Sequence, residues 1–557
     1  MDALQQAQGW VQSGYFDQET REAARASIQN PEALLSAFGS ELTFGTGGLR
    51  GVLGVGTARM NRYTVARATL GLARWLRRRA AQPSVAIAHD SRHGSEEFTR
   101  VAAETLAAEG VHVHVFPELA PTPMLSYAVR SLRCDAGIMI TASHNPKEYN
   151  GYKVYGPDGC QITDRAAGEI TGEIDKCAYT DPRALAGEEA RKNGLWSDVG
   201  DEVRKSFAQA CLFCRADPSV CTAVRAAYTP LHGAGLQPVR EVLGHMQGVT
   251  VVEVEAQVKP DGDFPTCAKP NPELPDALAL GLRTAERCAA DLLLATDPDC
   301  DRVGVAVRTP QGAYQILSGN EVGLLLLQYI LRTRKEQGSL PESPVVVKTI
   351  VSSDLAFPIA QAFGAEVREV LTGFKYIGET IGELERAGGE NRFVFGFEES
   401  CGYLAGTHVR DKDGIMACML VCEMAQALKS EGQSLLDALR RLYEEYGYLA
   451  SALMSFDIEG ALPMKAMESA MARLRKNPPQ ALAGRAVEQV RDYAGGLNGL
   501  PPSNVLSFEG GGLKAIVRPS GTEPKVKVYL FARGDVREEA EQLLEAMKAD
   551  AGLWLKR

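Results

Sequence analysis

One supersecondary pattern occurs three times along the chain, and this repetition limits the possible folds more than any other feature. Each copy has a short apolar strand, a polar loop, a helix, a glycine and a second strand. In chain order the copies are SVAIAHDSRHGSEEFTRVAAETLAAEGVHVHVF, CTAVRAAYTPLHGAGLQPVREVLGHMQGVTVVEV and SPVVVKTIVSSDLAFPIAQAFGAEVREV. Strands that alternate with helices of this length predict βαβ units with parallel strand pairs. Because the copies are widely spaced, we expect three related α/β domains with mixed sheets.

The C-terminal part of the sequence has a different pattern. GLKAIVRPSGTEPKVKVYLFARG predicts two strands joined by a polar loop, and VREEAEQLLEAMKADAGLWL predicts an amphipathic closing helix. This indicates a smaller α+β domain, and a chain of 557 residues is too long for a single core. We therefore expect four domains around a central cleft: residues 1–200, which include a helical extension before Leu42, then 201–316, 317–447 and 448–557.

Charge and hydropathy narrow the possible partners. The formal net charge is −10 and the sequence pI about 5.5, which argues against nucleic acids and anionic membranes as partners but leaves small phosphorylated molecules possible. The first residues, MDALQQAQGWV, do not resemble a signal peptide, and apolar runs such as LLLLQYIL are too short to span a bilayer. Cys211 and Cys214 form a CxxC without a second one to complete a zinc site, so we expect reduced, packed cysteines and a cytoplasmic protein.

A serine follows the apolar strand GIMI in the segment ITASHNPKEYNGYKVYG. Residues at the end of a buried strand in an α/β domain lie where ligands bind. Ser143 has His144 beside it and Lys153 shortly downstream, so a hydroxyl, a base and a cation occur together. A turn serine beside a surface histidine is the alternative that this segment alone leaves open.

Three aspartates alternate in LLLATDPDCDRVG, directly after another apolar strand. A compact loop of this kind can turn Asp297, Asp299 and Asp301 toward one hard cation. The sequence does not fit an EF-hand, because Arg302 and Arg308 occupy the positions of its glycine and its bidentate glutamate. Three carboxylates leave room for one more oxygen, which suits Mg²⁺ shared with a phosphate.

Three further loops carry polar groups. FVFGFEESCGYL places Glu398, Glu399 and Ser400 at a turn where they could bind sugar hydroxyls, although alone this is an ordinary turn. VRPSGTEPKVKVYL offers an arginine, two hydroxyls and a glycine amide for a phosphate, against the alternative of a plain hairpin turn. FGTGGLRG carries Arg50 but lacks the Walker A lysine and the dinucleotide fingerprint, so nucleotide binding is not indicated.

Taken together, TASHNP, DPDCDR, GFEES and RPSGTEP resemble the α-D-phosphohexomutase family, and the likeness covers nearly the whole chain in the family's order. TPLHGAG at 229–235 and LTGFKYIG at 371–378 are most similar to the bacterial phosphoglucomutase branch with its phosphopentomutase-like members. The sequence departs from the family at Cys300, where alanine is common, and at Cys401, where an aromatic is common.

The resemblance implies a role for each motif. Ser143 carries the phosphoryl group and joins Asp297, Asp299 and Asp301 around Mg²⁺. The remaining implied site residues are the following: for phosphoryl stabilisation Arg50 and Lys153; for proton and charge handling His144 and Lys375; for substrate binding Arg302, Thr372, Gly373, Glu398 and Ser400; and for the non-reacting phosphate Arg518, Ser520, Gly521 and Thr522.

The implied reaction interconverts glucose 1-phosphate and glucose 6-phosphate through a phosphoserine and glucose 1,6-bisphosphate, which acts as intermediate and activator. Phosphopentomutase and phosphomannomutase with the same mechanism are the alternatives. A metal-dependent phosphomonoesterase is disfavoured because such sites usually use two metals and the sequence offers ligands for one. A non-catalytic sugar-phosphate binding protein would not need a serine beside metal ligands. The preferred sugar, the general base and the choice between monomer and homodimer stay open.

Overall fold

The computed structural model describes residues 2–45, 47–458, 463–520 and 525–554. Three helices form the N-terminal extension: α1 (Ala3–Gln12), α2 (Gln18–Ile28) and α3 (Pro31–Phe38). Trp10 of α1 packs against Phe16 and against Tyr63 of α4 (Arg62–Arg77), with ring centroids 4.3 and 5.6 Å away. This aromatic cluster attaches the expected helical extension to the first α/β domain.

The first α/β domain contains a six-stranded mixed sheet in the order β1-β5-β4-β2-β3-β6. β2, β3, β4 and β6 run parallel, whereas β5 is antiparallel to both β1 and β4. Its elements are β1 (Leu49–Val52), α4 (Arg62–Arg77), β2 (Ser84–His89), α5 (Ser95–Ala108), β3 (His112–Val115), α6 (Thr122–Ser131), β4 (Ala136–Ile140), β5 (Tyr149–Tyr155), α7 (Asp164–Ile174), α8 (Gly187–Lys192) and β6 (Trp196–Asp198).

Helices cover both faces of this sheet. Along β2, Val85 and Ile87 pack into the core formed with α4, α5 and α7, whereas Ala86 and Ala88 pack into the core shared with α6 and α9 (Asp201–Phe213). A strand that is buried on both faces reads as an almost continuous apolar run, because alternate side chains enter different cores. This explains why the strands preceding the polar motifs could be identified in the sequence.

The second and third α/β domains repeat the arrangement with fewer strands. Their sheets have the orders β11-β10-β9-β7-β8 and β13-β12-β14-β15. The elements of the second domain are α9, β7 (Val224–Thr229), α10 (Leu236–Gly244), β8 (Val249–Glu253), α11 (Glu255–Val258), α12 (Pro275–Cys288), β9 (Leu292–Thr296), β10 (Val303–Arg308) and β11 (Tyr314–Leu317). Those of the third are α13 (Gly319–Glu336), β12 (Val345–Thr349), α14 (Ala356–Ala362), β13 (Glu366–Val370), α15 (Phe374–Arg386), η1 (Glu390–Arg392), β14 (Phe393–Glu398), β15 (Gly402–Ala405), α16 (Gly414–Ser430) and α17 (Leu435–Tyr446).

The three domains share one topological unit. In each, two parallel strands correspond to one copy of the sequence repeat, a third parallel strand follows, and the chain then turns back into an antiparallel strand. The third strands are β4, β9 and β14, and the returning strands are β5, β10 and β15. The loops with Ser143, with the three aspartates and with Glu398–Cys401 therefore occupy the same place in each domain. The expectation of three related α/β domains is confirmed.

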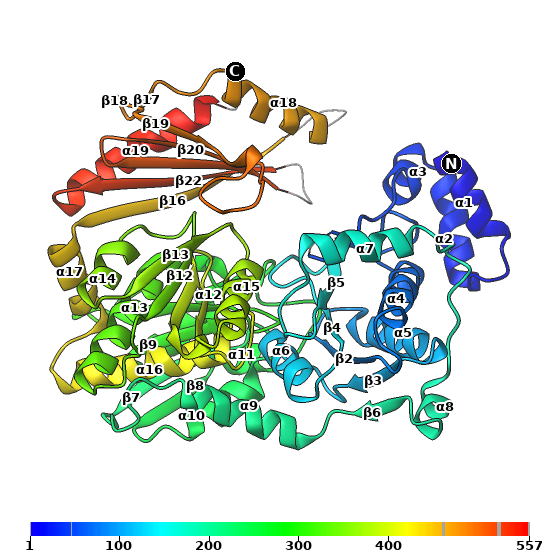
Figure 1. Cartoon of the computed structure of the whole chain (residues 1–557), viewed down its shortest axis with the longest axis horizontal. Coiled ribbons are helices and arrows are strands. Elements are labelled where there is room, and N and C mark those ends of the chain that lie inside the picture. The colour runs from blue at the N-terminus through cyan, green and yellow to red at the C-terminus, as the bar shows by residue number, and fades with distance from the viewer. Residues whose placement is uncertain (1, 46, 459–462, 521–524, 555–557) are drawn as a thin grey trace.

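The fourth domain is the smaller α+β unit that the sequence predicted. An antiparallel sheet in the order β16-β22-β21-β20-β19 forms its centre. Its elements are β16 (Tyr448–Asp457), α18 (Pro463–Lys476), β17 (Ala481–Leu482), β18 (Arg485–Ala486), β19 (Gln489–Asp492), η2 (Tyr493–Gly495), β20 (Leu506–Gly510), β21 (Leu513–Pro519), β22 (Lys525–Gly534) and α19 (Arg537–Trp554). Figure 1 shows this sheet above the third domain, with the first domain beside them.

Apolar cores join the domains. One continuous core includes side chains from the first, second and third domains, and α16 lies within it with Ile415 to Cys422 fully buried. A smaller core joins Ile350 and Leu371 of the third domain to Ile516 and Tyr529 of the fourth. Among the residues described, no helix is both long enough and apolar enough to cross a bilayer.

Candidate active site

Ser143 lies in the loop that follows β4, and its backbone holds an unfavourable conformation. Its φ is 53°, in the left-handed region, and its side chain is buried with 3% of the residue exposed. Holding a non-glycine residue there costs roughly 1–3 kcal/mol and persists only where surrounding contacts enforce it. The Ser143 amide donates to Thr141 Oγ1 at 2.8 Å, and the Ser143 hydroxyl donates to Asp297 Oδ2 at 2.9 Å. The nucleophile candidate of the first domain thus touches the carboxylates of the second.

The three aspartates form a compact buried group. Carboxylate oxygens of Asp297, Asp299 and Asp301 lie within 4.8 Å of one another, and each residue is at most 1% exposed. In the described part of the chain, Asp299 Oδ1 and Asp301 Oδ1 have no hydrogen-bond partner. Buried oxygens normally have a partner, and hard divalent cations bind through carboxylate oxygens. The donor set therefore fits Mg²⁺.

Cations surround the aspartates. Lys153 Nζ lies 2.8 Å from Asp299 Oδ2, which also accepts a hydrogen bond from Thr122 at 2.8 Å. Burial opposes the ionisation of Asp299, but Lys153 outweighs it, and the pKa of Asp299 falls below its usual value. Burial and the neighbouring carboxylates instead raise the pKa of Asp297 well above its usual value. A cation bound among the three carboxylates would offset the mutual repulsion that helps to raise the pKa of Asp297.

His144 lies beside the serine hydroxyl, and it contacts the same oxygen that donates a hydrogen bond to Asp297. Its Nδ1 lies 3.2 Å from Ser143 Oγ. Burial, followed by the charges of Arg302 and Arg50, lowers the pKa of His144 well below the usual value for histidine. The imidazole is therefore neutral at physiological pH and has a free lone pair to offer.

Two residues that the sequence analysis missed support the serine loop. The guanidinium of Arg92 donates to the backbone carbonyls of Ser143 and Asn145, and it pairs with buried Asp90 at 3.2 Å. Asp90 also accepts a hydrogen bond from the Thr141 hydroxyl at 2.6 Å. Asp90 and Arg92 lie directly after β2, in the sequence HDSR. An acidic and a basic residue directly after a buried strand could have indicated them in the sequence.

Lys412 is a second omission. It lies between β15 and α16, and its Nζ is 3.1 Å from Asp301 Oδ2 and 3.0 Å from Asp411 Oδ1. Burial opposes its charge, but Asp301 and Asp411 raise the pKa of Lys412 above its usual value. The third domain therefore supplies a cation to the aspartate group. The charged run RDKDG before an apolar helix could have indicated it.

The hydroxyl-binding candidates lie around Arg302. Its Nη1 donates to the Ser400 carbonyl and to Glu273, both at 3.1 Å. Glu398 Oε1 accepts the Gly373 amide at 2.8 Å, so the two predicted segments of the third domain meet here. Thr372 Oγ1 is buried without a hydrogen-bond partner among the described residues. Burial, and then Glu398, raises the pKa of Glu399 to about 8.

Arg50 and Lys375 are placed differently. Arg50 is exposed on β1 opposite Gly151 of β5, and its charge acts on His144 and Arg92. Lys375 Nζ instead lies 2.7 Å from Asp164 of α7, which links the third domain to the first. Its proposed role in the reaction stays a prediction.

The hairpin of the fourth domain faces the same site. Arg518 of β21 lies opposite Lys527 of β22 in the strand register. The Ser520 amide donates a hydrogen bond to the Lys525 carbonyl at 2.7 Å. The charge of Lys527 contributes to the lowered pKa of His144. Gly521 and Thr522, predicted to bind phosphate, lie outside the described residues.

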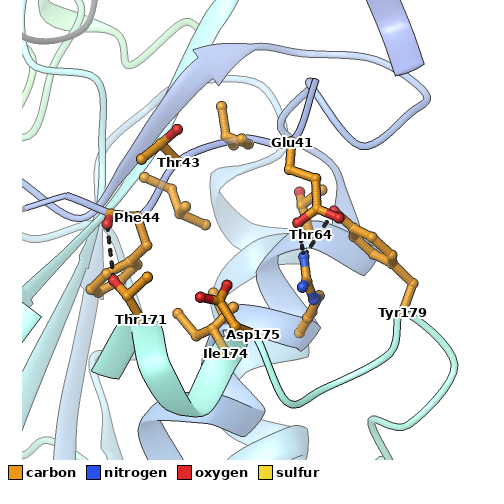
Figure 2. A pocket seen from close by; sticks show the side chains of 12 residues that line it. Glu41, Thr43, Phe44, Thr64, Thr171, Ile174, Asp175 and Tyr179 are labelled. Atoms are coloured by element: carbon orange, nitrogen blue, oxygen red, sulfur yellow. Dashed lines mark hydrogen bonds and ion pairs between the residues drawn. The ribbon is translucent and has the colours of Figure 1, made fainter. Parts of the chain in front are cut away.

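A cavity of about 150 Å³ lies away from this chemistry. Figure 2 shows it between α4, α7 and the segment 41–44, where Arg67 contacts Glu41 and Tyr179. None of the predicted site residues lines it. The fold and the main site instead define a four-domain enzyme with a buried serine, a carboxylate group for one divalent cation, and a ring of lysine and arginine side chains.

Comparison with known proteins agrees with this class. Four domain models of phosphoglucomutase/phosphomannomutase match in order: α/β/α domain I at residues 41–180, domain II at 206–312, domain III at 318–446 and the C-terminal domain at 467–549. The phosphoglucomutase of Staphylococcus haemolyticus is 38% identical over 522 residues, which cover 91% of this chain and 93% of that protein. The phosphoglucomutase of a Staphylococcus aureus strain is 36% identical over 530 residues, with 92% and 93% covered.

Solved structures agree on the fold. The structure of a putative phosphomannomutase from Thermus thermophilus has a TM-score of 0.69 at 24% identity and covers 92% of this chain and 99% of that one. Parafusin, a phosphoglucomutase from Paramecium, has a TM-score of 0.69 at 16% identity, with 93% and 94% covered. The chain belongs to the phosphoglucomutase/phosphomannomutase family, and the resemblance noted in its motifs is confirmed.

Proposed function

We propose that this enzyme interconverts glucose 1-phosphate and glucose 6-phosphate. Phosphorylated Ser143 would donate its phosphoryl group to the substrate and would then be phosphorylated again by the bisphosphate intermediate. The observation that carries this proposal is the 2.9 Å contact between Ser143 Oγ and Asp297 Oδ2 inside a buried carboxylate group. Ser143 with His144 at 3.2 Å provides an oxygen nucleophile with a neutral base beside it. The names of the curated relatives favour glucose over mannose and pentose phosphates.

The surrounding residues support a phosphoryl-transfer role. Such reactions depend mainly on alignment and on neutralising charge at the transferring group. Lys153 and Lys412 bring positive charge to the edge of the site, and Arg302 lies between the aspartates and the sugar loop. When bound, Mg²⁺ would be held by Asp297, Asp299, Asp301 and an oxygen of the phosphorylated Ser143, and would supply further neutralising charge.

A bisphosphate intermediate fits an active site whose serine and whose phosphate-binding residues come from different domains. Ser143 belongs to the first domain, whereas the phosphate-binding candidates Arg518 and Ser520 belong to the fourth. Glucose 1,6-bisphosphate could then present either phosphate to Ser143 after turning over, and added glucose 1,6-bisphosphate would act as an activator. Water must be excluded during this step because it would hydrolyse the phosphoserine. We place the reaction in the cytoplasm.

The test is a coupled assay with glucose, mannose and ribose 1-phosphates, each with MgCl₂ and a trace of glucose 1,6-bisphosphate. We expect glucose 1-phosphate to be the best substrate and Ser143→Ala to lose about 10⁴-fold or more of kcat. Ser131→Ala, on the outer side of α6, is the matched control and should keep full activity. Mass spectrometry should place a phosphate on Ser143. Full activity of Ser143→Ala would rule out the mechanism, and release of free phosphate without glucose 6-phosphate would indicate a phosphatase.

A further inference from the structure

A second group of metal-ligating side chains lies outside the active site. Cys211 is in the last turn of α9, whereas His408 and Asp413 come from the segment between β15 and α16. One ligand atom from each lies within 4.8 Å of the others. Cys211 is fully buried, and the side chains of His408 and Asp413 are 7% and 0% exposed. Nothing in the proposed reaction uses these residues.

The donor types and their spacing point to a specific ion. We propose that Cys211, His408 and Asp413 bind a zinc-like divalent cation that fastens α9 to the segment before α16. Cys211 Sγ lies 3.9 Å from His408 Nε2 and 3.5 Å from Asp413 Oδ2. Ligand atoms around tetrahedral zinc are roughly 3.3–3.6 Å apart, given bonds of about 2.0–2.3 Å. The His408–Asp413 separation of 2.8 Å must widen by about half an ångström.

Each ligand is already oriented by a second contact. His408 Nδ1 faces Cys214 Sγ at 3.6 Å, so the other ring nitrogen is directed at Cys211 and Asp413. Asp413 Oδ1 accepts the amides of Ile415 and Met416 at 2.9 and 3.0 Å, which leaves Oδ2 for the ion. Metal-binding histidines and carboxylates are commonly fixed in this way. Cys214 supports the imidazole, and the fourth position is left for a small ligand such as water.

Binding would leave the buried charge unchanged. Without metal, the Cys211 thiol donates to Asp413, and an imidazolium of His408 paired with the Asp413 carboxylate at 2.8 Å brings the total charge to zero. With the ion, a thiolate, a neutral imidazole and a carboxylate bind two positive charges and again sum to zero. Two protons leave for solvent, one from Cys211 and one from His408. The exchange therefore avoids an uncompensated charge in the core, which is the main obstacle to burying an ion.

The metal site would affect the mutase reaction by holding in place the segment that contains Lys412. Asp413 directly follows Lys412, which contacts Asp301, and the Gly414 amide donates to the Cys300 carbonyl at 3.2 Å. A side chain at Gly414 would lie 2.7 Å from that carbonyl, so the segment packs tightly against the aspartate loop. Thiolate and imidazole ligands select zinc over magnesium, so the two sites would hold different metals.

The experiment uses the full-length protein, stripped with a chelator and returned to excess MgCl₂. After one equivalent of Zn²⁺ and desalting, elemental analysis should find about one zinc per chain. Cys211→Ala and His408→Ala should each retain less than about a tenth of that amount, whereas Cys422→Ala, a buried cysteine of α16 outside the cluster, should retain it all. Zinc should also raise the melting temperature of the wild type but not of Cys211→Ala.

A cadmium derivative of the wild type gives a test that needs no variant to fold. A cadmium–thiolate absorption band and an anomalous scattering peak among Cys211, His408 and Asp413 would support the site. Absence of retained zinc in the wild type, equal retention by Cys211→Ala, or a peak only at the aspartate group would overturn it. Because metal content is measured in the absence of sugar phosphate, failure here leaves the proposed mutase reaction untouched.

Discussion

Lys412 Nζ lies 3.1 Å from Asp301 Oδ2, so a lysine of the third domain neutralises an aspartate of the second. Both side chains are buried, and the same ammonium group contacts Asp411 at 3.0 Å. The contact shows that the site is assembled from separate domains before any substrate binds.

Replacing Lys412 with methionine should destabilise the metal-free enzyme by about 3 kcal/mol, because buried carboxylates lose their counter-charge. The loss should be smaller in saturating MgCl₂, since the divalent ion supplies charge to the same carboxylates. Urea unfolding with and without MgCl₂ measures both values, with Lys429→Met, at an exposed ion pair with Asp291, as the control. An equal loss of stability with and without MgCl₂ would contradict the assignment of the divalent ion to these carboxylates.

Arg92→Lys should lower kcat by about 10²-fold with little change in KM, because a single ammonium cannot hold the Ser143 and Asn145 carbonyls together. Steady-state kinetics on glucose 1-phosphate checks the split. Arg100→Lys, on the exposed face of α5, should behave as wild type. A rise in KM alone would instead place Arg92 in substrate binding.

Gly233→Ala should destabilise the protein by about 2 kcal/mol, because its new methyl group would collide with Pro298 of the aspartate loop and lie 2.5 Å from the Pro298 carbonyl oxygen. The apparent affinity for Mg²⁺ should fall as the loop shifts. Gly244→Ala, at the end of α10 with open space around it, should be neutral or slightly stabilising. Thermal unfolding and magnesium titrations of activity compare the pair, which should differ in both measurements.

Glu399 gives a pH dependence whose sign is fixed. Its pKa is raised from 4.5 to about 8 by burial and by Glu398, so the folded state binds more protons than the unfolded state between these values. Stability therefore falls as pH rises through this window. Glu399→Gln should be close to the wild type in stability near pH 5 and more stable by about 4 kcal/mol near pH 9. Denaturant unfolding at both pH values checks this. If the stability difference between Glu399→Gln and the wild type were the same at pH 5 and pH 9, the raised pKa of Glu399 would be contradicted.

The sequence predicted the parts of the site that lie directly after buried strands. The ends of β4, β9 and β14 were recognisable because apolar runs stop abruptly at polar loops, and in the structure Ser143 Oγ lies 2.9 Å from Asp297 Oδ2. Arg92 and Lys412 could not be found in this way, because their contacts depend on how separate domains pack. Lys375 shows the converse, since its place in a recognised motif did not reveal its ion pair with Asp164.

The matching positions of the three motif loops bear on how substrate preference can change in this enzyme. Each loop is held by its own pair of strands, and the third carries the groups expected to recognise sugar hydroxyls, whereas the first two carry the serine and the aspartates. We therefore expect side-chain substitutions between β14 and β15 to alter which sugar is accepted, while the serine and the aspartates stay on their own strand pairs. Selection for a new sugar would concentrate its changes in that short segment.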